Sequence, residues 1–212
     1  MNKTIIGVSL FSFSVLFSAT TFAQTTPDYA KLIEQAHQKY KSNNDGKVAD
    51  YIPALATYSP KNFAITIATV DGKIYQVGDV NKPFPMESLS KVFTMALAME
   101  QHGPQVVLDK LGANATGMPF NSGLAVELTK GAPENPLVNA GAMSTVSLIE
   151  AKDKSDRWNK ILDNLNVWAD ATLTVNEPVF KSEMETNQHN QALAKLMESY
   201  NSFYGNTDEA VE

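Results

Sequence analysis

The sequence predicts an α+β fold that is mostly helical and contains one antiparallel hairpin. In several segments, apolar residues recur at the three- and four-residue spacing of one helix face. One segment of alternating strand-forming residues is followed by an Asp-Gly pair and then by a second such segment, which is a strong hairpin signal. With 212 residues, the chain can bury a sizeable core in one domain, or in one domain with a helical insertion.

The first residues have the order of a cleaved secretory signal. Lys3 is followed by an apolar run over residues 5–17, and a series of small residues ends at Ala23. A membrane anchor is the alternative, but a spanning helix needs about 20 apolar residues, and serines interrupt this shorter run. We therefore expect a signal peptide in residues 1–23, a domain in residues 24–212, and a periplasmic or secreted protein that has no membrane contact after cleavage.

The first half of the domain is predicted to hold one helix and the hairpin. Helical spacing predicts an amphipathic helix over residues 28–40, which the Ser-Asn-Asn-Asp-Gly segment at 42–46 ends. The two strands are predicted over residues 62–70 and 73–77, on either side of the Asp-Gly pair.

The second half is predicted to be helical. The run from Ser88 to His102 lacks Gly and Pro and is apolar on most faces, so we expect a largely buried helix that ends at Gly103. Residues 112–136 are rich in Gly, Pro and Asn and are expected to be loop, with one short helix as an alternative. Further helices are predicted over residues 140–149, 156–168 and 187–200, and the tail over 201–212 is polar and acidic.

Charge and composition exclude several kinds of partner and chemistry. The chain carries 23 Asp and Glu against 17 Lys and Arg, so we expect neither nucleic acid nor an anionic membrane surface as a partner. Cysteine is absent, which excludes a disulfide, a cysteine nucleophile and a cysteine-ligated metal. The three histidines, His37, His102 and His189, are dispersed along the chain, so we expect no metal and no cofactor.

The sharpest local motif is S-x-x-K, formed by Ser88 and Lys91 at the start of the predicted buried helix. Residues three apart share a helix face, so the Lys91 amine can approach the Ser88 hydroxyl. Burial and the positive helix end both disfavour the ammonium form, which would make Lys91 a base and Ser88 a nucleophile for acyl transfer. The alternative is an ordinary helix start that Ser88 caps, and the tetrapeptide alone does not separate the two.

Longer strings flank this motif. They are GKVADYIPALA at residues 46–56, NPLVNAGA at 135–142, and FKSE at 180–183 with Asn190 further on. In order and spacing, these strings and the S-x-x-K motif resemble the serine-dependent glutaminase family over residues 46–200. The resemblance implies a β-lactamase/DD-peptidase-like fold, with an antiparallel sheet and a helical domain. It also implies hydrolysis of L-glutamine to L-glutamate and ammonia through a serine acyl-enzyme.

The resemblance implies three catalytic residues. Ser88 corresponds to the nucleophile, Lys91 to the residue that takes its proton, and Tyr51 to a tyrosine that lies over the nucleophile, relays protons and helps to bind substrate. The alternative for Tyr51 is a core aromatic whose hydroxyl meets a backbone carbonyl.

The resemblance also implies a clamp for the amino-acid substrate. Asn139 would hold the substrate α-carboxylate or amide, Glu183 would pair with the α-ammonium, and Asn190 would belong to the same clamp. A buried carboxylate is costly unless a cation meets it, which suits Glu183 to a zwitterion. The alternatives are a helix cap at Asn139, an exposed helical residue at Asn190 and a solvated carboxylate at Glu183.

Complete members of the family continue into further strands, so the resemblance predicts that these 212 residues hold only the first hairpin and the helical part. We expect little glutaminase activity from this chain by itself, and a homo-oligomer, either a dimer or a tetramer, when complete. The alternatives are a non-catalytic remnant that binds an amino acid or pairs with another chain, and a β-lactam-reactive serine hydrolase. The latter shares S-x-x-K but leaves the strings around Asn139 and Glu183 unexplained.

Overall fold

The computed structural model describes residues 27–211, and the predicted signal peptide lies outside these residues. The described chain forms two compact units. Of the described residues, the smaller unit holds 27–41 together with Phe63–Val80, and the larger holds Ser42–Asn62 together with 81–211.

The predicted hairpin forms the sheet of the smaller unit. Strands β1 (Ala64–Ala68) and β2 (Ile74–Gly78) pair antiparallel, with Ile65 opposite Val77. The turn between them contains Gly72 at φ +81°, a backbone conformation that glycine adopts readily. The hairpin prediction is therefore confirmed.

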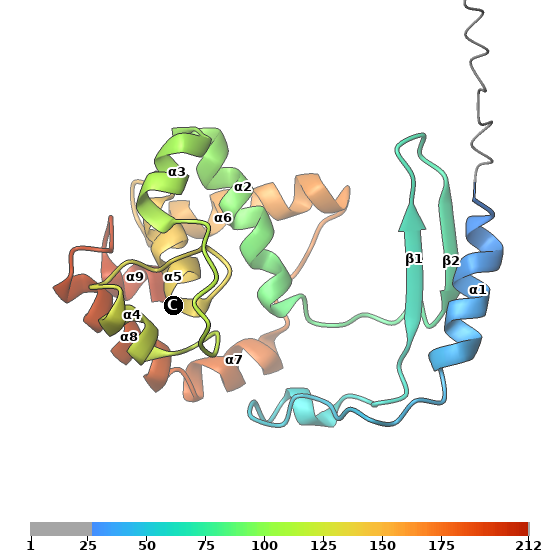
Figure 1. Cartoon of the computed structure of the whole chain (residues 1–212). Helices are drawn as coiled ribbons and strands as arrows, with labels where there is room; N and C mark the ends of the chain where they lie inside the picture. Colours follow the sequence, from blue (N-terminus) through green and yellow to red (C-terminus); the bar gives the residue numbers. More distant parts are fainter. Residues whose placement is uncertain (1–26, 212) are drawn as a thin grey trace, which may run out of the picture. The chain divides into compact units, whose positions relative to one another are not determined.

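The first predicted helix is also confirmed and packs on this hairpin (Figure 1). Helix α1 (Tyr29–Tyr40) begins after Asp28, whose carboxylate accepts a hydrogen bond of 3.0 Å from the Lys31 N–H. The ring of Tyr29 lies 5.5 Å from the ring of Tyr75 on β2. The helix thus provides the hairpin with an apolar partner, which a two-stranded sheet needs for stability.

The larger unit is helical. In chain order, its described elements are η1 (Leu55–Thr57), η2 (Glu87–Leu89), α2 (Ser90–His102), α3 (Pro104–Leu111), α4 (Gly123–Leu128), α5 (Asn139–Leu148), α6 (Lys154–Ala169), α7 (Glu177–Glu185), α8 (Gln188–Ser199) and α9 (Thr207–Val211). Helices predicted near 88–102, 140–149, 156–168 and 187–200 are confirmed as α2, α5, α6 and α8, and the short helix in the 112–136 loop is α4.

Helix α5 lies at the centre of the larger unit, where it contacts α2, α3, α8 and α9. Most of its residues are buried, and most of those are small, which allows the neighbouring helices to approach closely. Its buried hydroxyls are hydrogen-bonded: Ser144 donates to the Ser202 carbonyl at 2.6 Å, and Thr145 donates to the Gly141 carbonyl at 2.7 Å. This rigid helix carries Asn139 at its first position.

Two buried apolar clusters flank α5. The first consists of Val126, Ala140, Met143, Leu193, Ala194 and Met197, and the second consists of Ala98, Val107, Leu111, Leu148 and Ile149. Together they fix α2, α4 and α8 against α5, and therefore fix the helices that carry Lys91, Asn139 and Asn190.

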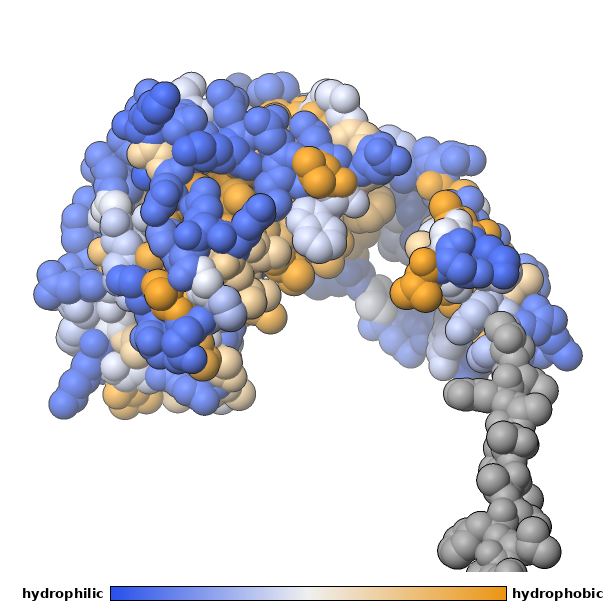
Figure 2. Space-filling view, turned by 90° about the horizontal axis from the view of Figure 1, so that it is seen from above, coloured by the Kyte–Doolittle hydropathy of each residue, from blue (hydrophilic) through white to orange (hydrophobic). Residues whose placement is uncertain are grey.

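The prediction of a largely buried α2 is wrong. The helix ends at Gly103 as expected, but Thr94 and Ala98 are its only buried residues, and Val92 is 47% exposed. The apolar residues of α2 extend around most of the helix, and its main helical neighbours are α3, α5 and α6. These neighbours leave part of the apolar surface of α2 uncovered. Figure 2 shows several apolar residues at the surface of the larger unit.

Helices α3 and α7 were not predicted. Pro104 directly follows Gly103, a pair that usually marks a break, yet proline suits the first position of a new helix because no N–H partner is needed there. Helix α7 likewise has a proline in its first turn and is capped by Asn176, whose side chain accepts from the Val179 N–H. In residues 27–211, no helix combines the length and apolarity that crossing a membrane requires.

Candidate functional site

A pocket of about 1510 Å³ opens in the larger unit, which is more than the roughly 300–1,000 Å³ of most small-molecule sites. Residues of η2, α2, α5, α6, α7 and α8 line it, together with the segment before η1 and parts of the loops between helices. All six predicted site residues are among them: Tyr51, Ser88, Lys91, Asn139, Glu183 and Asn190. The structure therefore brings together residues that are up to 139 positions apart in the chain.

The two serines of the S-x-x-K motif have different surroundings. The Ser90 hydroxyl donates to the Glu87 carbonyl at 2.7 Å, so it is engaged with the backbone. Ser88 lies in η2, is exposed and lines the pocket. Helix α2 begins after Leu89 and η2 after Met86, neither with a side-chain cap, so the alternative in which Ser88 caps the helix is not what the structure shows.

Lys91 is held by acceptors from a distant part of the chain. Its Nζ donates to the Leu137 carbonyl at 3.0 Å and to Asn139 Oδ1 at 2.7 Å. Burial lowers the pKa of the Lys91 ammonium from its ordinary value, as expected for a lysine that serves as a base. Within the described residues, Lys91 and Ser88 share the pocket but no hydrogen bond joins them.

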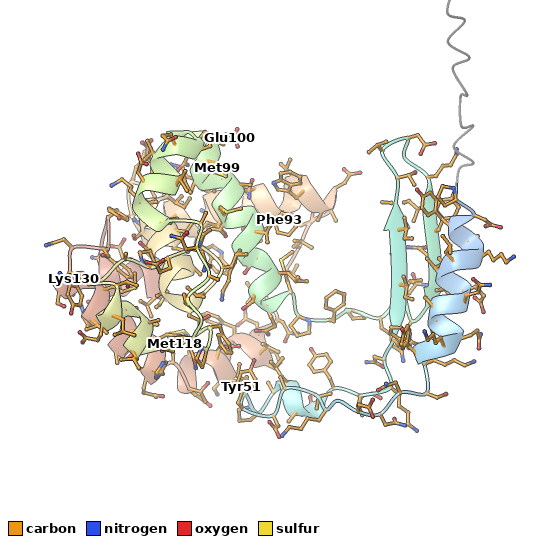
Figure 3. All side chains as sticks on the ribbon, viewed as in Figure 1. Tyr51, Phe93, Met99, Glu100, Met118 and Lys130 are labelled. Carbon is orange, nitrogen blue, oxygen red and sulfur yellow. The ribbon has the colours of Figure 1, made fainter. Side chains whose placement is uncertain are left out.

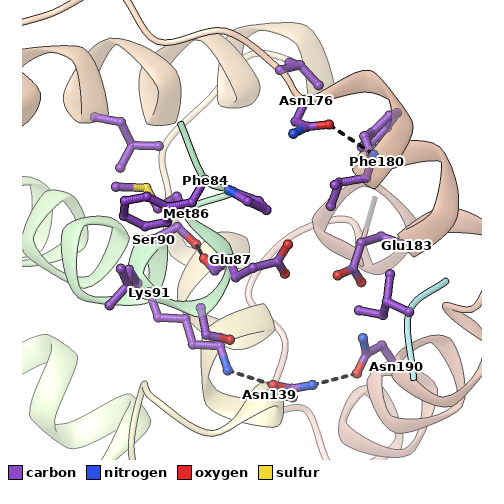
Figure 4. A pocket seen from close by; sticks show the side chains of 18 of the residues that line it. Phe84, Met86, Glu87, Ser90, Lys91, Asn139, Asn176, Phe180, Glu183 and Asn190 are labelled. Atoms are coloured by element: carbon purple, nitrogen blue, oxygen red, sulfur yellow. Dashed lines mark hydrogen bonds between the residues drawn. The ribbon is translucent and has the colours of Figure 1, made fainter. Parts of the chain in front are cut away.

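Asn139 links Lys91 to Asn190 (Figure 4). While its Oδ1 accepts from Lys91, its Nδ2 donates to Asn190 Oδ1 at 3.0 Å. Helix α5 has no side-chain cap at Val138, and the Asn139 amide points to these two partners, so it does not act as a helix cap. The three side chains form one hydrogen-bonded row along the pocket wall.

Glu183 faces a second carboxyl group across the pocket. It lies on α7, and Figure 4 shows the Glu87 side chain extending toward it. Burial, together with the hydrogen bond and the like charge of the Glu87 carboxyl, raises the pKa of Glu183 to about 7. Glu183 is therefore not an ordinary solvated carboxylate, and an ammonium group would be a favourable partner for it.

Glu87 is a site residue that the sequence interpretation missed. Its φ of +50° lies in the left-handed region, which is uncommon for a residue with a side chain and is concentrated at functional sites. Its place directly before Ser88 is the one sequence signal that would have drawn attention to it, because the φ angle cannot be read from residue types.

Tyr51 is presented by an anchored loop (Figure 3). Ile52 and Leu55 are buried against Val179 of α7, and the Ala54 N–H donates to Ser182 Oγ at 3.3 Å. Tyr51 itself is 69% exposed, so the alternative of a core aromatic is wrong. Its ring lines the pocket wall from a segment far from the S-x-x-K motif in sequence.

The described histidines make backbone and ring contacts. His102 and His189 hydrogen-bond to the carbonyls of Leu148 and Asn121, and His37 stacks on Phe63. In residues 27–211, no group of three or more His, Asp or Glu is placed to hold a metal ion. What the pocket offers is a hydroxyl, an amine of lowered pKa, two linked amides and a partly buried carboxyl, which suits a small zwitterion with a reactive carbonyl.

Solved structures with the same fold are glutaminases, which have a β-lactamase-like fold, so the predicted fold class is confirmed. A structure described as the probable glutaminase ybaS is 45% identical, with a TM-score of 0.83, covering 85% of this chain and 59% of that one. The probable glutaminase from Bacillus subtilis complexed with 6-diazo-5-oxo-L-norleucine is 26% identical, with a TM-score of 0.72, over 88% of this chain and 57% of that one.

Sequence comparisons agree. The model of the glutaminase family matches residues 46–212. The glutaminase of Colwellia psychrerythraea is 48% identical over 182 residues, which cover 86% of this chain and 58% of the relative. Glutaminase 1 of Escherichia coli K12 is 45% identical over 180 residues, or 85% of this chain and 58% of the relative. The chain belongs to the glutaminase family, and it spans a little under three fifths of the length of these relatives.

Proposed function

We propose that this pocket hydrolyses the side-chain amide of L-glutamine to give L-glutamate and ammonia. The observation that carries the proposal is the convergence, in one pocket of a glutaminase-family chain, of Ser88 with the hydrogen-bonded row Lys91, Asn139 and Asn190 and with Glu183. Membership of the glutaminase family indicates the substrate. The pocket contains groups that suit both the side-chain amide and the α-amino-acid end of glutamine.

In the proposed reaction, Lys91 takes the Ser88 proton, directly or through the Tyr51 hydroxyl. Ser88 Oγ then attacks the side-chain amide carbon, and the amide nitrogen takes a proton and leaves as ammonia. Water hydrolyses the γ-glutamyl ester and restores the Ser88 hydroxyl. In this proposal the Ser88 backbone N–H, in the first turn of η2, donates to the oxyanion, because the leading N–H groups of a helix have no partner within it.

Substrate recognition in this proposal uses both charges of the amino acid. The Glu183 carboxylate pairs with the α-ammonium, and amide N–H groups of Asn139 and Asn190 donate to the α-carboxylate. Asn139 uses one N–H for Asn190, so each amide keeps N–H capacity for substrate.

The function is tested by ammonia release from L-glutamine. Because the chain spans 58% of the E. coli relative, two proteins are compared: residues 24–212, and a chimera in which the remaining residues of that relative follow Glu212. We expect turnover by the chimera at a typical enzymatic kcat of about 1–10³ s⁻¹. The unextended chain should be about 100- to 1,000-fold slower, because the site as described offers one oxyanion donor.

Two outcomes would contradict the proposed function. Absence of ammonia release from both proteins, with glutamine bound, would favour a non-catalytic amino-acid-binding protein. Hydrolysis of a β-lactam in preference to glutamine would favour a β-lactam-reactive serine hydrolase. Full turnover by the unextended chain would support glutamine hydrolysis and contradict only the expected difference in rate between the two proteins.

Exchanging Glu183 for glutamine is expected to weaken glutamine binding about 10- to 100-fold, while kcat changes less. A charge-assisted contact is worth about 1.5–3 kcal/mol, and the ammonium is remote from the scissile amide. Calorimetric titration in a Ser88→Ala background measures the affinity without turnover. Glu185→Gln on the same helix, outside the pocket, is the matched control and should leave affinity unchanged.

The same titration should depend on pH. Because the pKa of Glu183 is about 7, the carboxyl is increasingly protonated below pH 7 and then cannot pair with an ammonium. Glutamine affinity should therefore fall about tenfold per pH unit below 7 and level off above it. Glu183→Gln should remove this dependence. Equal affinity at pH 6 and pH 8 in the unsubstituted site would show that Glu183 does not bind the ammonium.

Export also stays a proposal, because residues 1–23 lie outside the described part of the chain. We expect the exported protein to begin at Gln24, since small residues precede it at the end of the apolar run. N-terminal sequencing of the exported protein decides this, and a start at Met1 would refute the signal peptide. A periplasmic or secreted location and assembly as a dimer or tetramer are parts of the same proposal.

A further inference from the structure

We propose that Asn135 is a positioning residue for Lys91: its side chain fixes the loop that presents the Leu137 carbonyl to the lysine amine. The inference rests on the proposed function, in which Lys91 is the base. Asn135 does not line the pocket, and it acts through the backbone of residues 135–139.

Both polar atoms of the Asn135 side chain are hydrogen-bonded to backbone groups. Its Oδ1 accepts from the N–H groups of Leu137, at 2.9 Å, and Val138, at 3.1 Å, which closes a tight turn. Its Nδ2 donates to the Asn114 carbonyl at 2.8 Å, and the Asn114 N–H in turn donates to the Glu134 carbonyl at 2.7 Å. One amide thus holds its own turn and ties that turn to a second loop.

Gly141 fixes the same turn from the other side. It is buried in the first turn of α5, and a Cβ atom at this position would overlap the Asn135 carbonyl oxygen. The backbone of the turn therefore rests directly on the helix that carries Asn139. Pro136, between the two, has a restricted φ and narrows the turn to few conformations.

The turn delivers two acceptors to one amine. Lys91 Nζ donates to the Leu137 carbonyl at 3.0 Å and to Asn139 Oδ1 at 2.7 Å. A neutral amine has two N–H groups and one lone pair. With both N–H groups engaged, the lone pair is directed away from the turn, toward the pocket that Ser88 lines.

The Leu137 side chain takes no part in this arrangement, because it is 50% exposed and only its carbonyl meets Lys91. The geometry therefore depends on what holds the backbone at Leu137, and the side chain that bonds directly to its N–H is that of Asn135. The other titratable side chains that line the pocket with Lys91 are Tyr51, Tyr58, Lys82, Glu87, Glu183 and His189.

The test compares Asn135→Leu, of similar shape, with Asn135→Asp, which keeps the oxygen that accepts from Leu137 and Val138. In the chimera, Asn135→Leu should lower kcat for glutamine about 10- to 100-fold, the effect expected when a catalytic group is misplaced by about 1 Å. The affinity for L-glutamate should change less than about threefold, because the ammonium clamp is untouched. Asn135→Asp should recover most of kcat.

A second measurement follows the protonation of the Lys91 amine and does not require that the protein turn over substrate. Acetylation of Lys91 by acetic anhydride across pH, measured by peptide mass spectrometry, reports the titration of its amine. In Asn135→Leu this titration should move to higher pH, toward that of an ordinary lysine, because a loosened turn admits water to the amine. Asn206→Leu is the matched control: its Oδ1 accepts from the Glu209 N–H at 3.2 Å, outside the pocket, and neither readout should change.

Two results would overturn the inference. One is that the Asn135→Leu protein is folded, as judged by thermal melting, and has the same kcat and the same Lys91 titration as the parent. The other is a parallel loss of kcat and glutamate affinity with the Lys91 titration unmoved, which would mean a purely structural role. If Asn135→Leu does not fold, the same measurements of kcat, glutamate affinity and Lys91 titration are made on Asn135→Ser, whose side chain keeps a shorter hydrogen-bond acceptor. A parent chimera without turnover would count against the proposed function, and the Lys91 titration would still decide this inference.

Discussion

Ser88→Ala is expected to abolish glutamine hydrolysis in the chimera, with a fall in kcat of about 10⁴- to 10⁶-fold. The Ser88 hydroxyl forms the covalent intermediate in the proposed reaction. The only other hydroxyl of the motif, that of Ser90, donates to the Glu87 carbonyl and is therefore not expected to replace it. Glutamine affinity should persist, because the proposed clamp residues are unchanged.

The matched control is Ser199→Ala, an exposed serine at the end of α8 whose hydroxyl donates to the Leu196 carbonyl at 2.6 Å. It lies outside the pocket and should retain parental turnover. If Ser88→Ala keeps more than about a hundredth of the parental kcat, the attacking group is not Ser88.

Lys91→Met should lower kcat by about 10²- to 10⁴-fold, the usual contribution of a positioned acid or base. Methionine keeps much of the apolar stem but supplies no amine, so the Leu137 carbonyl and Asn139 Oδ1 also lose their donor. Because burial lowers the pKa of Lys91, the parental kcat should rise with pH as the ammonium loses its proton. The residual activity of Lys91→Met should lack that rise.

Lys160→Met is the control for this variant. The Lys160 amine also donates to a backbone carbonyl, that of Glu150 at 2.7 Å, but it lies outside the pocket. Its loss should leave the pH profile unchanged. An identical pH profile in the parent and in Lys91→Met would show that another group takes the Ser88 proton.

Much of the fold could be predicted because its signals are local. The Asp-Gly turn predicts the hairpin, and apolar periodicity predicts α1, α5, α6 and α8. Helices α3 and α7 were missed because Pro104 and Pro178 follow glycine or polar residues and are typical of loops, whereas tertiary contacts let them start helices. The exposure of α2 was missed because burial depends on which neighbours cover a helix, and periodicity does not contain that information.

The site also has features that could be predicted from the sequence and features that could not. The order of motifs predicts that Tyr51, Ser88, Lys91, Asn139, Glu183 and Asn190 belong to one site, and all six line one pocket. Two features depend on geometry that residue types do not encode. The left-handed φ of Glu87 and the contact of Lys91 with a carbonyl 46 positions away both arise only when the chain is folded.

Covalent labelling decides whether Ser88 is the nucleophile of a glutamine-specific pocket. The probe is 6-diazo-5-oxo-L-norleucine, a reactive glutamine analogue present in the structure of the Bacillus subtilis relative. Peptide mass spectrometry of the labelled chimera should find one adduct, on Ser88, which excess L-glutamine prevents and which Ser88→Ala lacks. An adduct on another residue, or one that persists in Ser88→Ala, would contradict the assignment of the nucleophile.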